Sequence, residues 1–166
     1  QLTFLQIASP HREHFKDVQQ KYQDWITKEA EKVNRKFETK EWKPIVLETT
    51  QYSQRDLSAL FKIAHFCLIT SLHDSMNLVA KEYVAMRNDS LGVLILSQFA
   101  GASRHLKEAL IVNPHNTEEI GTAIFTALSM PPSEQYRRMN IMRTIIKDYN
   151  VYRWAAEFIK SVTSLS

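Results

Sequence analysis

Five short apolar runs limit how this chain can fold more than any other feature of its sequence. They are LTFLQIA at 2–8, PIVLETT at 44–50, FCLIT at 66–70, GVLILS at 92–97 and ALIV at 109–112. Their apolar residues are continuous and do not alternate with polar ones, which is typical of strands buried on both faces. Helical patterns recur between the runs, and parallel strands need such connections. The chain therefore predicts an α/β fold, a parallel sheet covered by helices.

The helical patterns follow a regular order. The expected helices cover about 14–34, 56–64, 77–86, 117–130 and 131–165. Thr117 is the expected cap of the fourth helix, because acidic residues follow it and favour a helix amino terminus. The last stretch is basic and rich in methionine, and it looks suited to pack against something other than the sheet. A length of 166 residues is enough for one domain with a sizeable core.

Composition narrows the class of partner. Lys and Arg exceed Asp and Glu by 21 − 18 = +3, which mildly favours anionic ligands such as phosphates. The basic residues form no dense stripe, so no nucleic acid is expected, and no apolar run is long enough to suggest a membrane span. One cysteine, Cys67, permits no disulfide framework and predicts a reducing, cytoplasmic location. His11 and His14 lack a third ligand of matching spacing, so we expect no metal.

A polar cluster follows the third apolar run. The stretch SLHDSMNLVAKEYVA, 71–85, places Asp74, Ser75 and Asn77 immediately before a strong helix former. In open parallel sheets, ligands lie beyond the carboxyl ends of the strands, where loops enter helices. The free amides and the macrodipole of the helix amino terminus make an anion site there, and phosphate is the natural ligand.

Plainer interpretations of the same residues remain open at this point. Asp74 can either cap the helix or accept hydrogen bonds from ligand hydroxyls. Lys81 and Glu82 can belong to a solvated helix face, although Glu82 lies too far into the helix to cap it. The small residues of FAGAS, 99–103, can reflect close packing or a polar turn before a helix.

Several separated motifs closely resemble the trehalose-6-phosphate synthase family. They are FLQIASPHRE, DSMNLVAKEYVA, GVLILSQFAGA, ALIVNPHNTEEIGTAI and ALSMPPSEQYRR, in the family's order over nearly the whole chain. The resemblance implies the carboxyl-terminal, Rossmann-like half of a GT-B glycosyltransferase. It also implies retaining transfer of glucose from a nucleotide sugar, usually UDP-glucose, to glucose 6-phosphate, giving trehalose 6-phosphate. No metal or other cofactor is implied.

The resemblance assigns the donor sugar to the polar cluster. Asp74 matches the aspartate that holds the glucose hydroxyls, and it is the residue expected to be catalytic. The amides of Ser75, Met76 and Asn77 match those that share the sugar. The family is thought to use no protein nucleophile, because the donor phosphate deprotonates the incoming hydroxyl on the same face of the sugar.

The nucleotide and the acceptor have further matches. The amides of Leu78 and Val79 match those that meet the donor diphosphate, and Glu82 matches the glutamate that accepts the ribose hydroxyls. Tyr52 matches the position whose backbone reads the uracil base. Arg12 matches the arginine that grips the phosphate of the acceptor, a task that suits a guanidinium.

The chain also departs from the family. His73, Asp74 and Ser75 stand where the family usually reads Arg-Asp-Gly, so either φ stays negative at Ser75 or the pocket is altered. Residues 1–130 match a donor domain that lacks its first segment, and 131–166 match a helical tail that crosses to an amino-terminal domain. With that domain missing, we expect the chain to be inactive alone and to associate through an exposed methionine and aromatic stripe.

Two other functions fit the same residues. Glucosylglycerol-phosphate synthase uses a similar donor half with a different phosphorylated acceptor. A non-catalytic, synthase-like regulatory subunit is slightly favoured by His73 and Ser75, whereas the presence of Arg12, Asp74 and Glu82 favours an active site.

Overall fold

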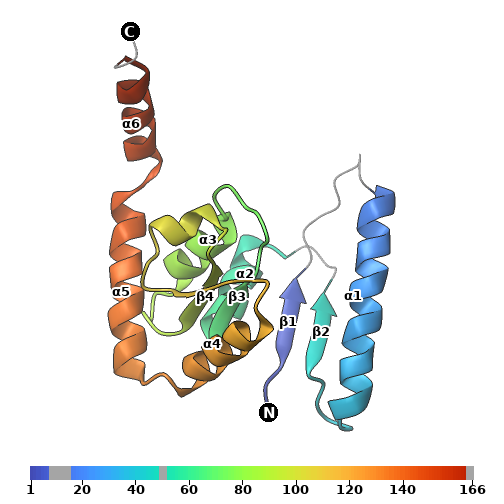
Figure 1. Ribbon diagram of the computed structural model, residues 1–166. Coiled ribbons are helices and arrows are strands. Elements are labelled where there is room, and N and C mark those ends of the chain that lie inside the picture. The colour runs from blue at the N-terminus through green and yellow to red at the C-terminus, as the bar shows by residue number, and fades with distance from the viewer. Residues whose placement is uncertain (8–15, 49–51, 164–166) are drawn as a thin grey trace. The chain divides into compact units, whose positions relative to one another are not determined.

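The computed structural model describes residues 1–7, 16–48 and 52–163. These residues form two compact units, Gln1–Ser53 and Gln54–Ser166, whose elements are labelled in Figure 1. All five predicted strands are present and pair in parallel, three of them in one sheet and two in another. The predicted α/β fold with parallel strands and covering helices is therefore confirmed, although the strands are divided between the two units.

The first unit pairs β1 (Phe4–Ile7) with β2 (Ile45–Glu48), and α1 (Lys16–Phe37) packs on β2. The amide of Asn34 ties the end of α1 to β2. Its Nδ2 donates to the Ile45 carbonyl and its Oδ1 accepts from the Ile45 amide, each at 2.9 Å. These two bonds satisfy the first polar backbone groups of the strand.

The apolar run of β1 predicts a strand buried on both faces. Within its unit, β1 is not buried in this way. Leu5 is 40% exposed and Gln6 is exposed as well. The described residues of this unit, 1–7, 16–48 and 52–53, form a two-stranded sheet and one helix, which is too little structure to cover both faces.

The second unit contains the more deeply buried sheet. Its strands are β3 (Phe66–Ile69), β4 (Val93–Ser97) and β5 (Leu110–Val112), in the order β3-β4-β5. Every residue of the central strand β4 is buried. Leu94 and Leu96 join one apolar cluster, and Val93 and Ile95 join a second one. Because successive side chains of a strand point to opposite faces, the two clusters cover the two faces of the sheet.

Helices on each face complete these clusters. α2 (Gln54–Ile63), α3 (Leu78–Met86) and α5 (Pro132–Asp148) contribute to the cluster of Leu94, whereas α4 (Thr117–Ser129) contributes to that of Val93. The cap of α4 is Asn116 and not Thr117. Its Oδ1 accepts from the amides of Glu118 and Glu119, and an Asn side chain is as good a cap as Thr or better.

The carboxyl-terminal stretch is two helices, α5 and α6 (Val151–Thr163), with a break that Figure 1 shows between them. The expected exposed methionine stripe is wrong for α5. Met139 and Met142 are fully buried in the same cluster as Leu94, because α5 packs against α3. The expected exposed aromatic residues are present, and most of them, Tyr152, Trp154 and Phe158, lie on α6.

Candidate functional site

Residues 70–77 join the carboxyl end of β3 to α3. We call them the donor loop, because the resemblance assigns the donor sugar to them. The Asp74 carboxylate organises it. Its Oδ1 accepts from the amides of Met76 at 3.3 Å and Asn77 at 3.0 Å, and its Oδ2 accepts from the Asn77 side chain at 2.9 Å. Asp74 therefore braces the loop itself and does not cap α3.

Asn77 is the cap of α3. Its Oδ1 accepts from the amide of Ala80 at 2.8 Å, and the residue is buried. Its backbone is left-handed, with φ of 62°. Asn tolerates this conformation better than most residues, because its short polar side chain bonds locally. One residue thus turns the chain, caps the helix and anchors to Asp74.

The first turn of α3 presents open amides. The amides of Leu78 and Val79 lie in the first turn of the helix, where no helical carbonyl is placed to accept from them, and the two residues are 60% and 47% exposed. By contrast, the amides of Met76 and Asn77 already donate to Asp74. Of the five backbone amides expected to meet ligand, those of Ser75, Leu78 and Val79 have no acceptor among the described residues.

Glu82 lies one turn further along α3, on the same face as Leu78, because residues four apart are neighbours on a helix. It is half-buried, and no described residue gives it a hydrogen bond or an ion pair. A half-buried carboxylate without a partner beside open amides can accept hydroxyl groups from a ligand. The arrangement offers donors for an anion and an acceptor for a diol on one short helix.

Ser75 fits the loop without backbone strain. Among the described non-glycine residues, only Asn77 and Ser90 have positive φ. Serine at position 75 therefore occupies a conformation open to any residue, as one of the two sequence expectations has it.

A second segment runs beside the donor loop. Residues 98–102 follow β4, and the amide of Asp74 donates to the Phe99 carbonyl at 3.3 Å. In return, the Gly101 amide donates to the Asp74 carbonyl, and the Ala102 amide donates to the Met76 carbonyl, each at 2.9 Å. Sequence reasoning noted the small residues here but missed this backbone pairing. The signal was the run Ala-Gly-Ala, which allows two backbones to approach closely.

Two other predicted residues are Tyr52 and Arg12. Tyr52 is half-buried in the first unit, whereas Asp74 and Glu82 belong to the second, so the structure describes them separately. Arg12 lies outside the described residues. The structure thus brings together Asp74 through Glu82 within the second unit.

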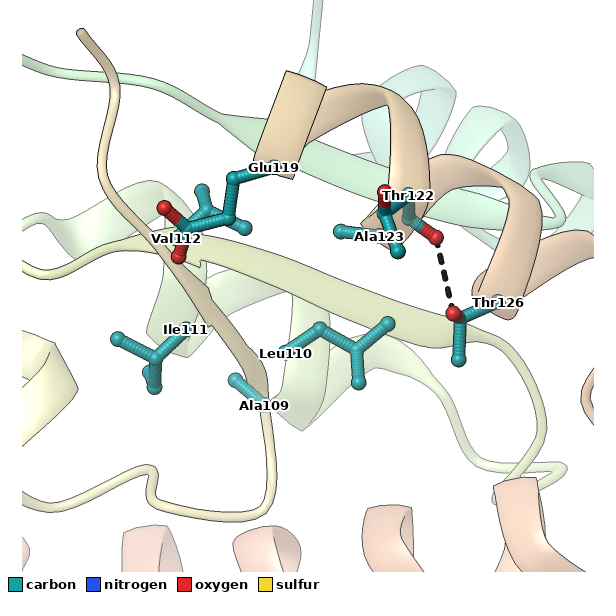
Figure 2. A pocket seen from close by; sticks show the side chains of 8 residues that line it. All are labelled: Ala109, Leu110, Ile111, Val112, Glu119, Thr122, Ala123 and Thr126. Atoms are coloured by element: carbon teal, nitrogen blue, oxygen red, sulfur yellow. Dashed lines mark hydrogen bonds between the residues drawn. The ribbon is translucent and has the colours of Figure 1, made fainter. Parts of the chain in front are cut away.

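A shallow depression lies apart from the donor loop, between β5 and α4 (Figure 2). Ala109–Val112 line one side, and Glu119, Thr122, Ala123 and Thr126 line the other. The Thr126 hydroxyl donates to the Thr122 carbonyl at 2.8 Å, so this polar group is already satisfied. Nothing in the lining matches the open amides of α3.

Other chemistry finds no support in the described part of the chain. No three His, Cys, Asp or Glu side chains gather there in a way that could hold a metal ion. Burial raises the pKa of the Cys67 thiol to about 12, so this group stays protonated and is a poor nucleophile. No helix among these residues is both long and apolar enough to cross a membrane.

The parallel sheet, with a loop that enters a helix amino terminus at its carboxyl edge, defines a Rossmann-like domain of the class found in GT-B glycosyltransferases. The profile of Glycosyltransferase family 20 matches residues 1–164. The chain belongs to this family.

Relatives of known name support the assignment. Trehalose-6-phosphate synthase of Klebsiella pneumoniae is 38% identical over 99% of this chain and 35% of its own length. Glucosylglycerol-phosphate synthase of Synechocystis is 41% identical over 83% of this chain and 28% of its own length. The chain spans about a third of the length of the curated relatives it matches.

Solved structures agree over almost the whole chain. An α,α-trehalose-phosphate synthase (UDP-forming) from Burkholderia xenovorans, in complex with glucose-6-phosphate, is 38% identical with a TM-score of 0.86 over 97% of this chain and 35% of its own. A protein from E. coli bound with UDP-2-fluoro glucose is 34% identical with a TM-score of 0.85, over 96% and 35%.

Proposed function

We propose that this chain is the donor-binding half of an enzyme that transfers glucose from UDP-glucose to glucose 6-phosphate, giving trehalose 6-phosphate. The observation that carries the proposal is the amino terminus of α3, where the open amides of Leu78 and Val79 lie one turn from the unpartnered Glu82. The glucose-6-phosphate and UDP-2-fluoro glucose bound to the two solved relatives support the same substrate classes.

The proposed roles divide the nucleotide sugar along α3. The diphosphate lies at the amides of Leu78 and Val79, where the helix macrodipole favours negative charge. Glu82 accepts the ribose hydroxyls, in charge-assisted bonds that contribute roughly 1.5–3 kcal/mol each. The backbone of Tyr52 reads the base, and Arg12 holds the acceptor phosphate.

The glucose lies against the donor loop. Asp74 accepts sugar hydroxyls with the lone pairs that its loop bonds leave free, and the Ser75 amide is open to share them. The amides of Met76 and Asn77 serve the sugar less directly, because they already hold the Asp74 carboxylate. Asp74 thus has two tasks, to fix the loop and to place the donor sugar.

The reaction needs no protein nucleophile. The bond from the anomeric carbon to the diphosphate oxygen breaks, and its electron pair leaves with the diphosphate. A bond forms between the anomeric carbon and the acceptor hydroxyl on the same face, and the hydroxyl proton passes to the departing phosphate. The amides at α3 stabilise the charge that develops on that phosphate, which lowers the barrier.

Calorimetric titration of the chain with UDP-glucose tests the donor site. We expect saturable binding that Glu82→Ala weakens by about tenfold or more, because a charge-assisted bond is lost. Glu119→Ala, which removes another half-buried carboxylate on α4, is the matched control and should bind normally. ADP-glucose and GDP-glucose as competitors rank the bases. An affinity for UDP-glucose that is the same in Glu82→Ala as in the unchanged chain would contradict the assignment.

The 41% identity to glucosylglycerol-phosphate synthase supports an alternative function with a different acceptor, glycerol 3-phosphate. The two reactions share a donor half, and the acceptor is chosen mainly by residues outside this chain. Assays of the protein with its amino-terminal domain, with glucose 6-phosphate and glycerol 3-phosphate in parallel, decide between them. The 166 residues alone should transfer no glucose, and measurable turnover would refute that expectation.

A regulatory role is less well supported, because Ser75 needs no unusual backbone conformation. In the protein with its amino-terminal domain, Ser75→Gly should therefore change activity little. A protein that is inactive until Ser75→Gly restores it would contradict our interpretation of the loop. A protein that is inactive with either residue would favour the regulatory role.

We further propose that residues 1–130 with α5 form the donor domain and that α6 is the part that crosses to the amino-terminal domain. Tyr152, Trp154 and Phe158 expose large aromatic surfaces on this one helix. An exposed apolar face of this kind commonly marks an interface, and about two thirds of the relatives' length lies outside this chain.

Sedimentation velocity at rising concentration tests that interface. We expect the chain to self-associate and Trp154→Ser with Phe158→Ser to remove the association. Phe125→Ser, which changes an equally exposed ring on α4, serves as the control and should leave it unchanged. A monomer at every concentration, or equal loss in the control, would argue against α6 as the interface.

A further inference from the structure

The backbone of residues 99–102 lies against the donor loop along three successive peptide groups. Its partners are the amide and carbonyl of Asp74 and the carbonyl of Met76, and the pair has the geometry of a short parallel bridge between Asp74 and Ala100. Ala100 and Ala102 are each buried. Main-chain hydrogen bonds to this segment therefore hold the loop that carries the proposed sugar ligands, in addition to the side-chain bonds of Asp74.

Gly101 is the point of closest approach. A Cβ placed on it would overlap the carbonyl oxygen of Ser75, and it would lie 2.8 Å from the Ser75 carbonyl carbon and 3.4 Å from the Met76 Cα. These are backbone atoms, so no side-chain rotation can relieve the overlap. Among the described glycines, positive φ occurs at Gly92, so the need for glycine at 101 comes from space and not from backbone conformation.

We infer that Gly101 is a positioning residue for the donor sugar, acting through the Ser75–Met76 peptide. A side chain at 101 displaces that peptide, and with it the Ser75 carbonyl and the Met76 amide that donates to Asp74. The Asp74 carboxylate then loses part of its orientation. This inference rests on the proposed function, because it concerns the residues proposed to hold the glucose.

The same displacement should leave the nucleotide end intact. The start of α3 is fixed by the Asn77 cap and by the buried Ala80, Tyr83 and Val84. Leu78, Val79 and Glu82 keep their places as long as α3 does. If Gly101 merely stabilised the fold, its substitution would weaken binding of both the nucleotide and the glucose. If Gly101 is a positioning residue, its substitution weakens binding of the glucose alone.

The test compares Gly101→Ala with Gly121→Ala, the same chemical change at a glycine of α4 whose added Cβ meets nothing within 4 Å. Each variant is titrated with UDP and with UDP-glucose. We expect Gly101→Ala to bind UDP normally and to lose about tenfold or more of the additional affinity that the glucose supplies, the effect of losing one or two oriented hydrogen bonds. Gly121→Ala should bind both ligands as the unchanged chain does.

Amide hydrogen exchange gives a reading without ligand. In Gly101→Ala the amides of Met76, Asn77 and Ala102 should exchange about tenfold faster or more, because the first two donate to Asp74 and the third donates to the Met76 carbonyl, all within the displaced loop. The amides inside α3 should keep their protection. Equal exchange at residues 74–77 in both variants would overturn the inference.

The outcomes separate the inference from the function on which it rests. If the unchanged chain binds neither ligand, the proposed function fails, while the exchange result still decides whether Gly101 holds the loop. If it binds UDP-glucose and Gly101→Ala keeps the full glucose increment, the inference fails alone. If Gly101→Ala does not fold, exchange in the unchanged chain decides: UDP-glucose must protect residues 74–77 and 101–102 more than UDP does, and equal protection would refute the inference.

Discussion

Asn77 should respond to substitution in an unusual order, in which glycine is tolerated better than alanine. The residue combines a left-handed backbone, with φ of 62°, with a side chain that caps Ala80 and donates to Asp74. Alanine loses both side-chain bonds and keeps the backbone conformation that a Cβ disfavours. Glycine loses the same bonds but adopts the left-handed conformation freely.

The structure gives the size of the difference. Loss of the cap by alanine costs about 1 kcal/mol, and the left-handed backbone adds about 1–2 kcal/mol. Glycine at a cap costs only a few tenths of a kcal/mol relative to Asn, and the bond to Asp74 is lost in both variants. Asn77→Ala should therefore be less stable than Asn77→Gly by about 2 kcal/mol, or roughly 4–8 °C in Tm for a chain of this size.

Thermal unfolding followed by circular dichroism measures this order, and amide exchange at Tyr83 and Val84 reports whether α3 is the part that loosens. Equal Tm values for the two variants, or a lower value for Asn77→Gly, would refute the account of the left-handed cap. A change in Tm without faster exchange in α3 would place the effect elsewhere.

Two further predictions concern α5. The Arg143 Nη1 donates to the carbonyls of Val84, Ala85 and Arg87, each within 3.0 Å. Urea denaturation should therefore show that Arg143→Met lowers the free energy of unfolding by about 1–3 kcal/mol. The same loss for Lys147→Met, a substitution at an exposed position of α5, would contradict this prediction. Hydrogen bonds from Arg137 and Arg138 lower the pKa of Glu134 from 4.5 to about 2. This stabilisation is present above pH 4.5 and lost as the pH falls towards 2, so the Tm difference between the unchanged chain and Glu134→Gln should shrink over that interval, and a constant difference would refute it.

The sequence predicts strands more reliably than the chemistry of loops. The run GVLILS, 92–97, matches β4 to within a residue, because a continuously apolar stretch suits a strand that is covered on both faces. The parallel pairing of all five strands follows in the same way from their helical connections. The site residues between Asp74 and Glu82 are brought together because they are neighbours in sequence.

The other features of the fold and the site depend on contacts between residues far apart in sequence, which a local sequence pattern does not reveal. The burial of Met139 could not be read from its helix alone, since a methionine stripe suits a core and an interface equally well. The role of Gly101 depends on a backbone 26 positions away, at Ser75, whose approach no periodicity reveals. The role of Asn77 as the cap of α3 could have been predicted, because Asn is both a preferred cap and tolerant of positive φ.

The first turn of α3 turns its amides to the proposed ligand while the side chains of Leu78 and Val79 lie exposed. Main-chain amides are the same whatever residue carries them, so recognition at this point places almost no demand on residue identity. Substitutions at 78 and 79 should drift freely among residues compatible with a helix start. Proline is the exception, because it alone lacks the N–H group, and its absence at these two positions would be the trace that such recognition leaves in related sequences.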